Sequence, residues 1–323
     1  MHRYLAKFSL ALSLGCAAVA AWAGAYPDRP LKMIVPFAAG ASSDMLARTV
    51  ADGLATRLGQ PVVVENRAGA GGNIGADLVA KAAPDGYSLV IGSIGTHATN
   101  SLIYGSMPYD TVKDFTPVTL VASVSLVLVV HPSVPARDVK QLIAYLQERP
   151  GKVSYASGGV GASQHLAGEL FKYLAKVDMV HVPYKGSAGS IPDLISGRVP
   201  VMFADLPLVL SYIQNGSLRA LAVGDRERSP VLPSVPTLAE SGVPDYQANA
   251  WYGLFAPAGT PPDIANRLQR EVAAILEQPE VRKRLIAQGA NPSGMAPDAF
   301  KAFQRKEIDR WKTVVQAAHI KMD

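Results

Sequence analysis

Three glycine-rich segments hold the residue types best suited to binding chemistry, and each lies between a predicted strand and a predicted helix. They are PFAAGASSD at 36–44, NRAGAGGN at 66–73 and SGGVGASQH at 157–165. Turns of this kind aim free backbone N–H groups and the positive end of a helix at one point, and serine hydroxyls add further donors. The segments therefore predict a site for an anionic group, which could be a phosphate, a pyrophosphate or a carboxylate.

Nucleotide-binding motifs are missing from these turns. A dinucleotide-binding G-x-G-x-x-G would need glycine at position 74 or 164, where the chain has Ile74 and Gln164. The phosphate-binding triplet G-K-[ST] does not occur either, since Gly151-Lys152 continues with Val153. We therefore expect no nucleotide and no other cofactor.

Patterns for catalysis and for metal binding are equally weak. No G-x-S-x-G nucleophile elbow occurs, and the single cysteine, Cys16, lies in the leading segment, which excludes thiol catalysis in a processed chain. The histidines lack the spacing typical of zinc sites, so we expect no metal and no enzyme activity. Ser163, His165 and Asp205 could still meet as a triad, which leaves an exported serine hydrolase as the alternative.

The composition is that of a folded globular protein. Of the 323 residues, 49% are apolar and 18% are charged, which excludes a disordered chain. The formal net charge of +5 is small and the basic residues are scattered, apart from Arg282-Lys283-Arg284, so we expect no nucleic-acid partner. Because no cysteine follows the leading segment, stability must come from an apolar core rather than from disulfides.

Residues 1–25 have the order of a secretory signal peptide. Two basic residues precede a short apolar run, and two A-x-A sites follow it. The run is shorter than the ~20 residues that a membrane-spanning helix needs. We expect cleavage, with a mature start at Gly24 or Tyr26, and a periplasmic protein in a Gram-negative host. A lipid-modified Cys16 is the alternative.

The rest of the chain predicts an α/β fold. Short β-branched runs alternate with helical periodicity from Leu31 to Val223, which is typical of βαβ units and a mainly parallel sheet. After residue 257 the pattern is mostly helical. A helical tail without strands of its own needs a sheet to cover, so we expect the chain to return to the first sheet at 246–257. The expected strands are 31–36, 61–65, 87–92, 124–130, 152–156, 179–182, 199–203 and 218–223, and the expected helices are 45–58, 139–147, 163–174, 261–276, 280–288 and 297–317.

Ordered motifs run along the whole chain after the leading segment. They include Y-P-D-R-P at 26–30, P-F-A-A-G at 36–40, N-R-x-G-A-G-G-N-I-G at 66–75, H-V-P-Y-K-G at 181–186 and W-Y-G-L-F-A-P at 251–257. With these motifs the chain resembles the Bug family, the substrate-binding receptors of tripartite tricarboxylate transporters. Two positions depart from the family pattern: Ala38-Ala39, where proline is frequent, and Ala204-Asp205-Leu206, where Asp-Asn is frequent.

The resemblance implies a two-domain periplasmic binding protein of the Venus-flytrap kind. Such a protein closes around a small carboxylate and delivers it to the permease subunits in the membrane. Family ligands include tricarboxylates, dicarboxylates, amino acids and aromatic acids, and the sequence does not select among them. A ligand sensor that presents to a signalling partner would share the fold and differ only in partner. We expect a monomer.

Together the turns and the resemblance predict a ligand cleft between two domains. Domain 1 is expected at 26–123 and 251–323, and domain 2 at 124–250. The residues expected to bind the ligand are Phe37, Ala39, Gly40, Ser42, Ser43, Gly71, Gly72, Gly95 and Thr96 from domain 1, and Ser157, Gly158, Gly161, Ser163, His165 and Asp205 from domain 2.

Two charged residues leave their roles open. Lys185 either adds charge at the rim of the cleft or is simply solvated. Asp205 either caps the helix that follows it or faces the ligand, where an ionised carboxylate would repel a ligand carboxylate and select a hydroxyl or an ammonium group. For Asp205 we favour the ligand-facing position.

Overall fold

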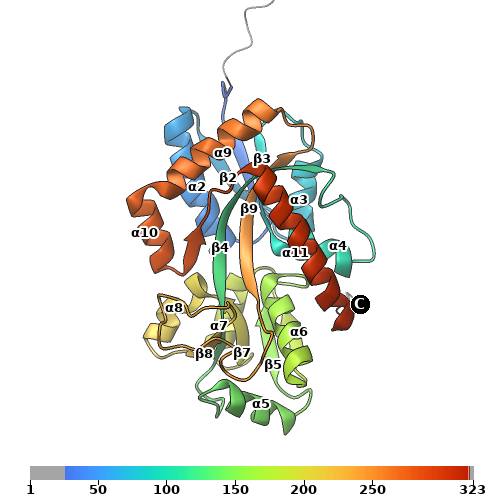
Figure 1. Cartoon of the computed structure of the whole chain (residues 1–323), viewed down its shortest axis with the longest axis vertical. Helices are drawn as coiled ribbons and strands as arrows, with labels where there is room; N and C mark the ends of the chain where they lie inside the picture. Colours follow the sequence, from blue (N-terminus) through green and yellow to red (C-terminus); the bar gives the residue numbers. More distant parts are fainter. Residues whose placement is uncertain (1–25, 319, 321–323) are drawn as a thin grey trace, which may run out of the picture.

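The computed structural model describes residues 26–318 and residue 320. The predicted signal peptide, residues 1–25, lies outside the described residues. Two α/β lobes are joined by two long strands, β4 and β9, which run from one lobe into the other (Figure 1). The order of strands through both lobes is β2-β1-β3-β9-β4-β7-β5-β6, and β8 and β10 also pair with β4.

The first lobe is built on a sheet whose parallel part is β2, β1 and β3. Its strands are β1 (Leu31–Val35), β2 (Val62–Asn66), β3 (Ser88–Ser93), β9 (Asn249–Pro257), β10 (Ala290–Pro292) and the first part of β4 (Phe115–Val130). Its helices are α2 (Ser42–Leu58), η1 (Ala70–Gly72), α3 (Asn73–Ala80), η2 (Gly95–Thr99), α4 (Asn100–Ile103), α9 (Pro262–Glu277), α10 (Pro279–Ala287) and α11 (Pro297–Ala317).

The second lobe contains the remaining strands and the last part of β4. Its strands are β5 (Ser154–Ser157), β6 (Val180–Pro183), β7 (Val201–Asp205) and β8 (Arg219–Val223). Its helices are α5 (Val139–Gln147), α6 (Ser163–Ala175), η3 (Ser187–Ser190), α7 (Ile191–Ile195) and α8 (Leu206–Gln214). Among the residues that the structure describes, no helix is long and apolar enough to cross a membrane.

The α/β prediction is confirmed, but the prediction of a mainly parallel sheet is wrong for the centre of the molecule. Strand β9 is antiparallel to β3 and to β4, and β4 is antiparallel to β7 and β8. The physical reason is the crossing itself, because the chain passes into the second lobe along β4 and comes back along β9. The predicted return to the first sheet at 246–257 is confirmed by the pairing of β9.

Two further predictions need correction. The strand expected at 124–130 begins at Phe115, because the buried stretch before it continues the ladder with β9. The C-terminal tail, expected to lack strands, contains β10, which pairs antiparallel with β4 through Ala290 and Val124. A strand of three residues that ends in proline has no periodicity that a sequence pattern could detect.

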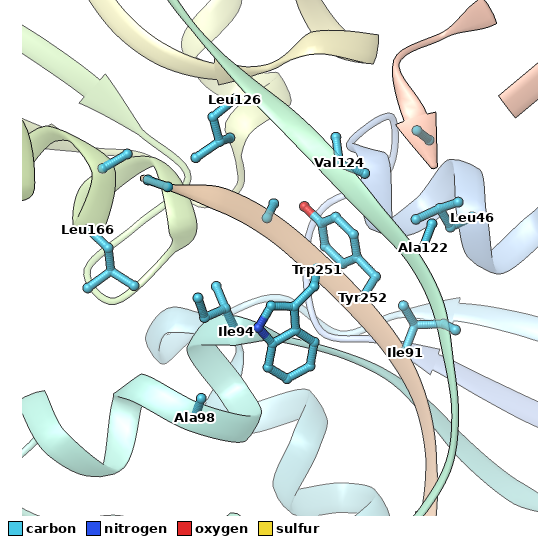
Figure 2. Packing of buried hydrophobic residues seen from close by; sticks show 14 of the residues in the cluster. Leu46, Ile91, Ile94, Ala98, Ala122, Val124, Leu126, Leu166, Trp251 and Tyr252 are labelled. Carbon is cyan, nitrogen blue, oxygen red and sulfur yellow. The ribbon is translucent and has the colours of Figure 1, made fainter. Parts of the chain in front are cut away.

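The core of the first lobe packs against both faces of β9. Trp251 and Tyr252 are successive residues and leave the strand toward different sides (Figure 2). Trp251 is fully buried against the rings of Phe300 and Phe303 on α11. Gly253 must be a glycine here, because a Cβ atom would collide with the Phe300 ring. These contacts hold α11 against one face of β9, and Tyr252 on the opposite face points toward the second lobe.

Candidate ligand-binding site

The glycine-rich turns meet where the two lobes face each other. Strands β1 and β2 end at the first and second turns, and β5 ends at the third. A Cβ atom on Gly71 would lie 2.8 Å from the carbonyl oxygen of Val160, and one on Gly95 would lie 3.0 Å from that of Gly161. Glycine is therefore needed at 71 and 95 to let the backbones of the two lobes approach.

A cavity with mixed polar and apolar walls lies between the turns. Its walls come from both lobes and carry uncharged hydrogen-bonding groups: serine hydroxyls, one amide and one phenol. The lining residues are Phe37, Ala41, Ser43, Ser93 and Tyr252 from the first lobe, and Gly158, Ala162, Ser163, Gln164 and Ser187 from the second. Hydroxyl and amide donors of this kind form charge-assisted hydrogen bonds with an anion such as a carboxylate.

Two helix N-termini from opposite lobes face this cavity. Ser43 lies in the first turn of α2, and Ser163 is the first residue of α6. The partial positive charge at each helix start favours an anion within the first turn. The cavity therefore offers one electropositive backbone end from each lobe.

The lobes are closed on each other. The free volume of the cavity is about 20 Å³, room for little more than one water molecule. Hydrogen bonds cross between the lobes: the Tyr252 hydroxyl donates to Asp205 Oδ2 at 2.7 Å, and Thr99 Oγ1 donates to the Gly161 carbonyl at 3.3 Å. A molecule larger than water can enter only when these contacts part.

Asp205 lies behind the cavity wall and holds two of the lining residues. Its fully buried carboxylate accepts hydrogen bonds from Gln164 Nε2 at 2.6 Å and from the Tyr252 hydroxyl. Burial raises the pKa of Asp205, and the hydrogen bonds from Tyr252 and Gln164 oppose that shift. The capping interpretation is wrong, because the side chain makes no cap hydrogen bond to α8. The carboxylate reaches the cavity only through Gln164 and Tyr252.

The residues expected as a catalytic triad are used in other contacts. His165 Nδ1 accepts a hydrogen bond from the Gly161 amide at 3.2 Å, and its ring stacks on His181 at 4.0 Å. Burial lowers the pKa of His165 to about 4, so the ring is neutral at pH 7. The Asp205 carboxylate is bonded to Gln164 and Tyr252 instead of His165. His165 therefore shapes the third turn, and the geometry does not favour a hydrolase.

The fifteen predicted binding residues fall into four groups. Phe37, Ser43, Gly158 and Ser163 line the cavity, and Gly71 and Gly72 line a second cavity of about 210 Å³ at the cleft mouth, which Lys185 also borders. Ala39 and Gly40 are exposed at the rim. The rest support the walls from behind: Ser42, Gly95, Thr96, Ser157, Gly161, His165 and Asp205.

Sequence reasoning missed several lining residues. Gln164 appeared only as the residue that breaks a nucleotide motif, although it follows Ser163 at the start of α6. Ser187 closes the Pro-Tyr-Lys-Gly turn after β6, so a fourth strand-to-helix turn was the available signal. Ser93 and Tyr252 end or lie within strands, where no local pattern distinguishes a cavity-facing residue from a core residue.

These features define the class of the protein. Two α/β lobes, a pair of crossing strands and a cavity between the lobes that carries hydrogen-bonding groups from both are those of a two-domain solute-binding protein. The profile of the tripartite tricarboxylate transporter family receptor matches residues 46–320. The chain belongs to this family, which confirms the resemblance given by the sequence motifs, and it is a solute-binding receptor of the tripartite tricarboxylate type.

Relatives of known name or structure agree with this assignment. Protein BugT of Bordetella pertussis is 41% identical over 323 residues, which cover 100% of this chain and 99% of BugT. The structure of R. palustris Rpa4515 with adipate has a TM-score of 0.89 and 41% identity, over 92% of this chain and 99% of that one. MatC (Rpa3494) from Rhodopseudomonas palustris with bound malate has a TM-score of 0.86 and 36% identity, over 90% and 100%.

Proposed function

We propose that this receptor captures a small carboxylate between its lobes in the periplasm and delivers it to membrane permease subunits. The observation that carries the proposal is the convergence of two helix N-termini and several serine hydroxyls from opposite lobes on one uncharged cavity. Since two of the solved relatives hold adipate and malate, dicarboxylates are the first candidates. In this proposal Ser43 and Ser163 contact the carboxylates of the ligand. Gln164 and Tyr252 orient the carbon chain of the ligand.

A thermal-shift screen of the processed protein tests the ligand class. A ligand at 100 times its Kd adds about 2.7 kcal/mol to the unfolding free energy, which raises the Tm by several degrees. We expect adipate or malate to raise the Tm and hexanoate, which matches the length of adipate with one carboxylate fewer, to do so less. A screen in which carboxylic acids leave the Tm unchanged would refute the proposed ligand class.

The two lobes act as separate domains in this proposal, with domain 1 at 26–123 and 251–323 and domain 2 at 124–250. The boundaries are supported by the register of the crossing strands, in which Ser123 pairs with Trp251 and Val124 with Ala250. Both crossings therefore lie side by side and form one hinge. Small-angle scattering with and without adipate tests closure, and a radius of gyration that does not change would argue for a rigid site.

Export is the remaining part of the proposal. Removal of residues 1–23 or of residues 1–25 gives a mature, monomeric protein that starts at Gly24 or at Tyr26. The order of basic residues, apolar run and A-x-A sites supports this. The intact mass of the secreted protein tests it, and a diacylglyceryl group on Cys16 would contradict it.

A further inference from the structure

A further cavity, which we call the hinge cavity, lies on the side of the crossing strands away from the ligand cleft. Neighbouring residues on a strand point to opposite faces, and directly paired residues of two strands share a face. Tyr252 lines the cleft, and its neighbour Trp251 leaves β9 on the other side (Figure 2). Ser123 pairs with Trp251 and therefore shares that other face. Asn249, two residues before Trp251, and its partner Ser125 lie on the same face.

The walls of this hinge cavity come from both lobes. Its volume is about 400 Å³, within the ~300–1,000 Å³ of small-molecule sites. The crossing strands give Ser123, Ser125 and Asn249, and the other walls are the segment after β8 in the second lobe and the segment from α10 to β10 in the first. The remaining lining residues are Asp225, Glu227, Arg228, Ser229, Pro230, Ile286, Gly289, Ala290 and Asn291.

The charges of the hinge cavity favour a cation. Asp225 and Glu227 bring two carboxylates. The guanidinium of Arg228 is already paired with Glu240 at 3.0 Å, and Arg226 donates to Gln247 Oε1 at 2.8 Å. The charge of Arg228 is offset by Glu240, and Arg226, whose partner is a neutral amide, does not line the cavity. Asp225 and Glu227 therefore leave an excess of negative charge among the lining residues.

Asp225 is the residue of this cavity whose side chain has an unsatisfied hydrogen-bond acceptor. Its Oδ2 atom is buried, and no donor among the described residues meets it in hydrogen-bond geometry, although the Ser125 hydroxyl and the Asn249 amide lie beside the carboxyl group. Burial raises the pKa of Asp225, while Ser125 and Asn249 next to it favour the ionised form. A buried carboxylate oxygen without a donor is costly, and an ammonium group that donates to this carboxylate would remove that cost.

We propose that the hinge cavity binds a small aliphatic amine through Asp225 and that its occupation holds the lobes closed. The second part follows from the position of the cavity. Rotation about the crossing strands moves the lobes apart on one side as it brings them together on the other. In this closed arrangement the cleft has about 20 Å³ of free volume and the hinge cavity about 400 Å³. An amine that fills the hinge cavity opposes its compression and therefore opposes opening of the cleft.

Calorimetry with propane-1,3-diamine tests the binding site, with propane-1,3-diol as the uncharged control and sodium chloride at matched ionic strength. Asp225→Asn should weaken diamine binding by about tenfold, because the amide keeps the shape and removes the charge. Glu227→Gln at an exposed position should weaken it by about threefold. Asp178→Asn, an exposed acid elsewhere in the second lobe, is the matched control and should leave binding unchanged. A wild type that does not bind the diamine, or an Asp225→Asn protein that binds it equally well, would overturn the site.

Titration of adipate with and without saturating diamine tests the effect on closure. We expect the diamine to tighten adipate binding by about threefold, and adipate to tighten diamine binding by the same factor, since coupling between two sites is reciprocal. An unchanged adipate affinity would overturn the effect on closure. This arm rests on the proposed function, but the failures differ: a protein that binds the diamine and no carboxylate refutes the proposed cleft ligand and leaves the hinge site standing.

Discussion

The first and third glycine-rich turns each place a helix N-terminus at the cavity, one from each lobe. The contacts that hold the two turns in place differ. In the first turn, Asp44 accepts hydrogen bonds from the Gly40 amide, from Arg48 and from Asn66, and the Arg48 side chain is half exposed. In the third turn, Ser157, His165 and His181 form a neutral, largely buried network. The first turn is thus held by an ion pair near solvent and the third by uncharged contacts in the interior.

This difference teaches which changes each turn tolerates. Ion pairs near solvent are screened and contribute little, so the first turn should survive the loss of its charge. A buried donor or acceptor that loses its partner lowers the free energy of unfolding by more than a screened ion pair does. The third turn and the Asp205 carboxylate should therefore be sensitive to the loss of any partner.

The largest effect is expected from Asp205→Ala. The change leaves the Gln164 amide and the Tyr252 hydroxyl, both buried, without their acceptor. We expect the free energy of unfolding to fall by about 2–4 kcal/mol, measured by urea denaturation. A loss below about 1 kcal/mol would contradict the view that this carboxylate organises the second-lobe wall.

Asp205→Asn tests whether the Asp205 carboxylate influences which ligand is bound. Because the carboxylate lies behind Gln164 and Tyr252, its charge should act on every ligand alike. We expect the affinities for succinate and for malate, which differ by one hydroxyl, to change by the same factor in titration calorimetry. A loss confined to malate would instead place Asp205 in contact with the ligand hydroxyl.

Ser163→Ala should weaken carboxylate binding by about 1.5–3 kcal/mol through loss of a charge-assisted hydrogen bond. Its counterpart Ser43→Ala tests whether the first lobe contributes equally, and Ser196→Ala at a position outside the cavity is the control. If Ser163→Ala binds as well as the wild type, the second-lobe helix end is not the carboxylate site. Recovery of every ligand chemically unchanged from the wild type would also remove the hydrolase alternative.

As the pH falls, the stability contributed by the third turn should be lost at a higher pH than that contributed by the first turn. Burial lowers the pKa of His165 to about 4, so its contribution is complete above the unfolded value of about 6.5 and is lost as the pH falls toward 4. We expect His165 alone to contribute roughly 1–3 kcal/mol to the fall in unfolding free energy between pH 6.5 and 4.5. His97 and His181 add to this fall, because burial lowers the pKa of each to about 3. His165→Gln should flatten this part of the profile, and an unchanged slope in that variant would show that other groups carry it.

The smallest effect is expected from Asp44→Asn. Burial raises the pKa of Asp44, but hydrogen bonds from Arg48, Gly40 and Asn66 together hold it below its usual value. Its contribution is therefore present above about pH 4 and is lost as the pH falls below that. At pH 7 we expect a loss of about 0.5–1 kcal/mol that shrinks in high salt. A loss as large as that of Asp205→Ala would erase the difference between the two turns.

The sequence by itself determined the features that depend on local backbone chemistry. Glycine and serine between a β-branched run and a helical pattern located the turns, and periodicity located helices such as Val139–Gln147 and Pro297–Ala317 at the bounds that the structure has. The ordered motifs determined the family. Phe37, Ser43, Gly158 and Ser163 could be predicted as cavity residues because turn chemistry places them there.

Only the tertiary structure decided what the closed lobes bring together. Tyr252 and Asp205 are 47 residues apart, and no local pattern indicates that a phenol on a crossing strand meets a carboxylate at the end of β7. Strand β10, the antiparallel crossing of β4 and β9, and the role of Gln164 depend on the same long-range contacts. Such contacts form between groups distant in sequence, so their partners are set by how the lobes pack and not by the residues on either side.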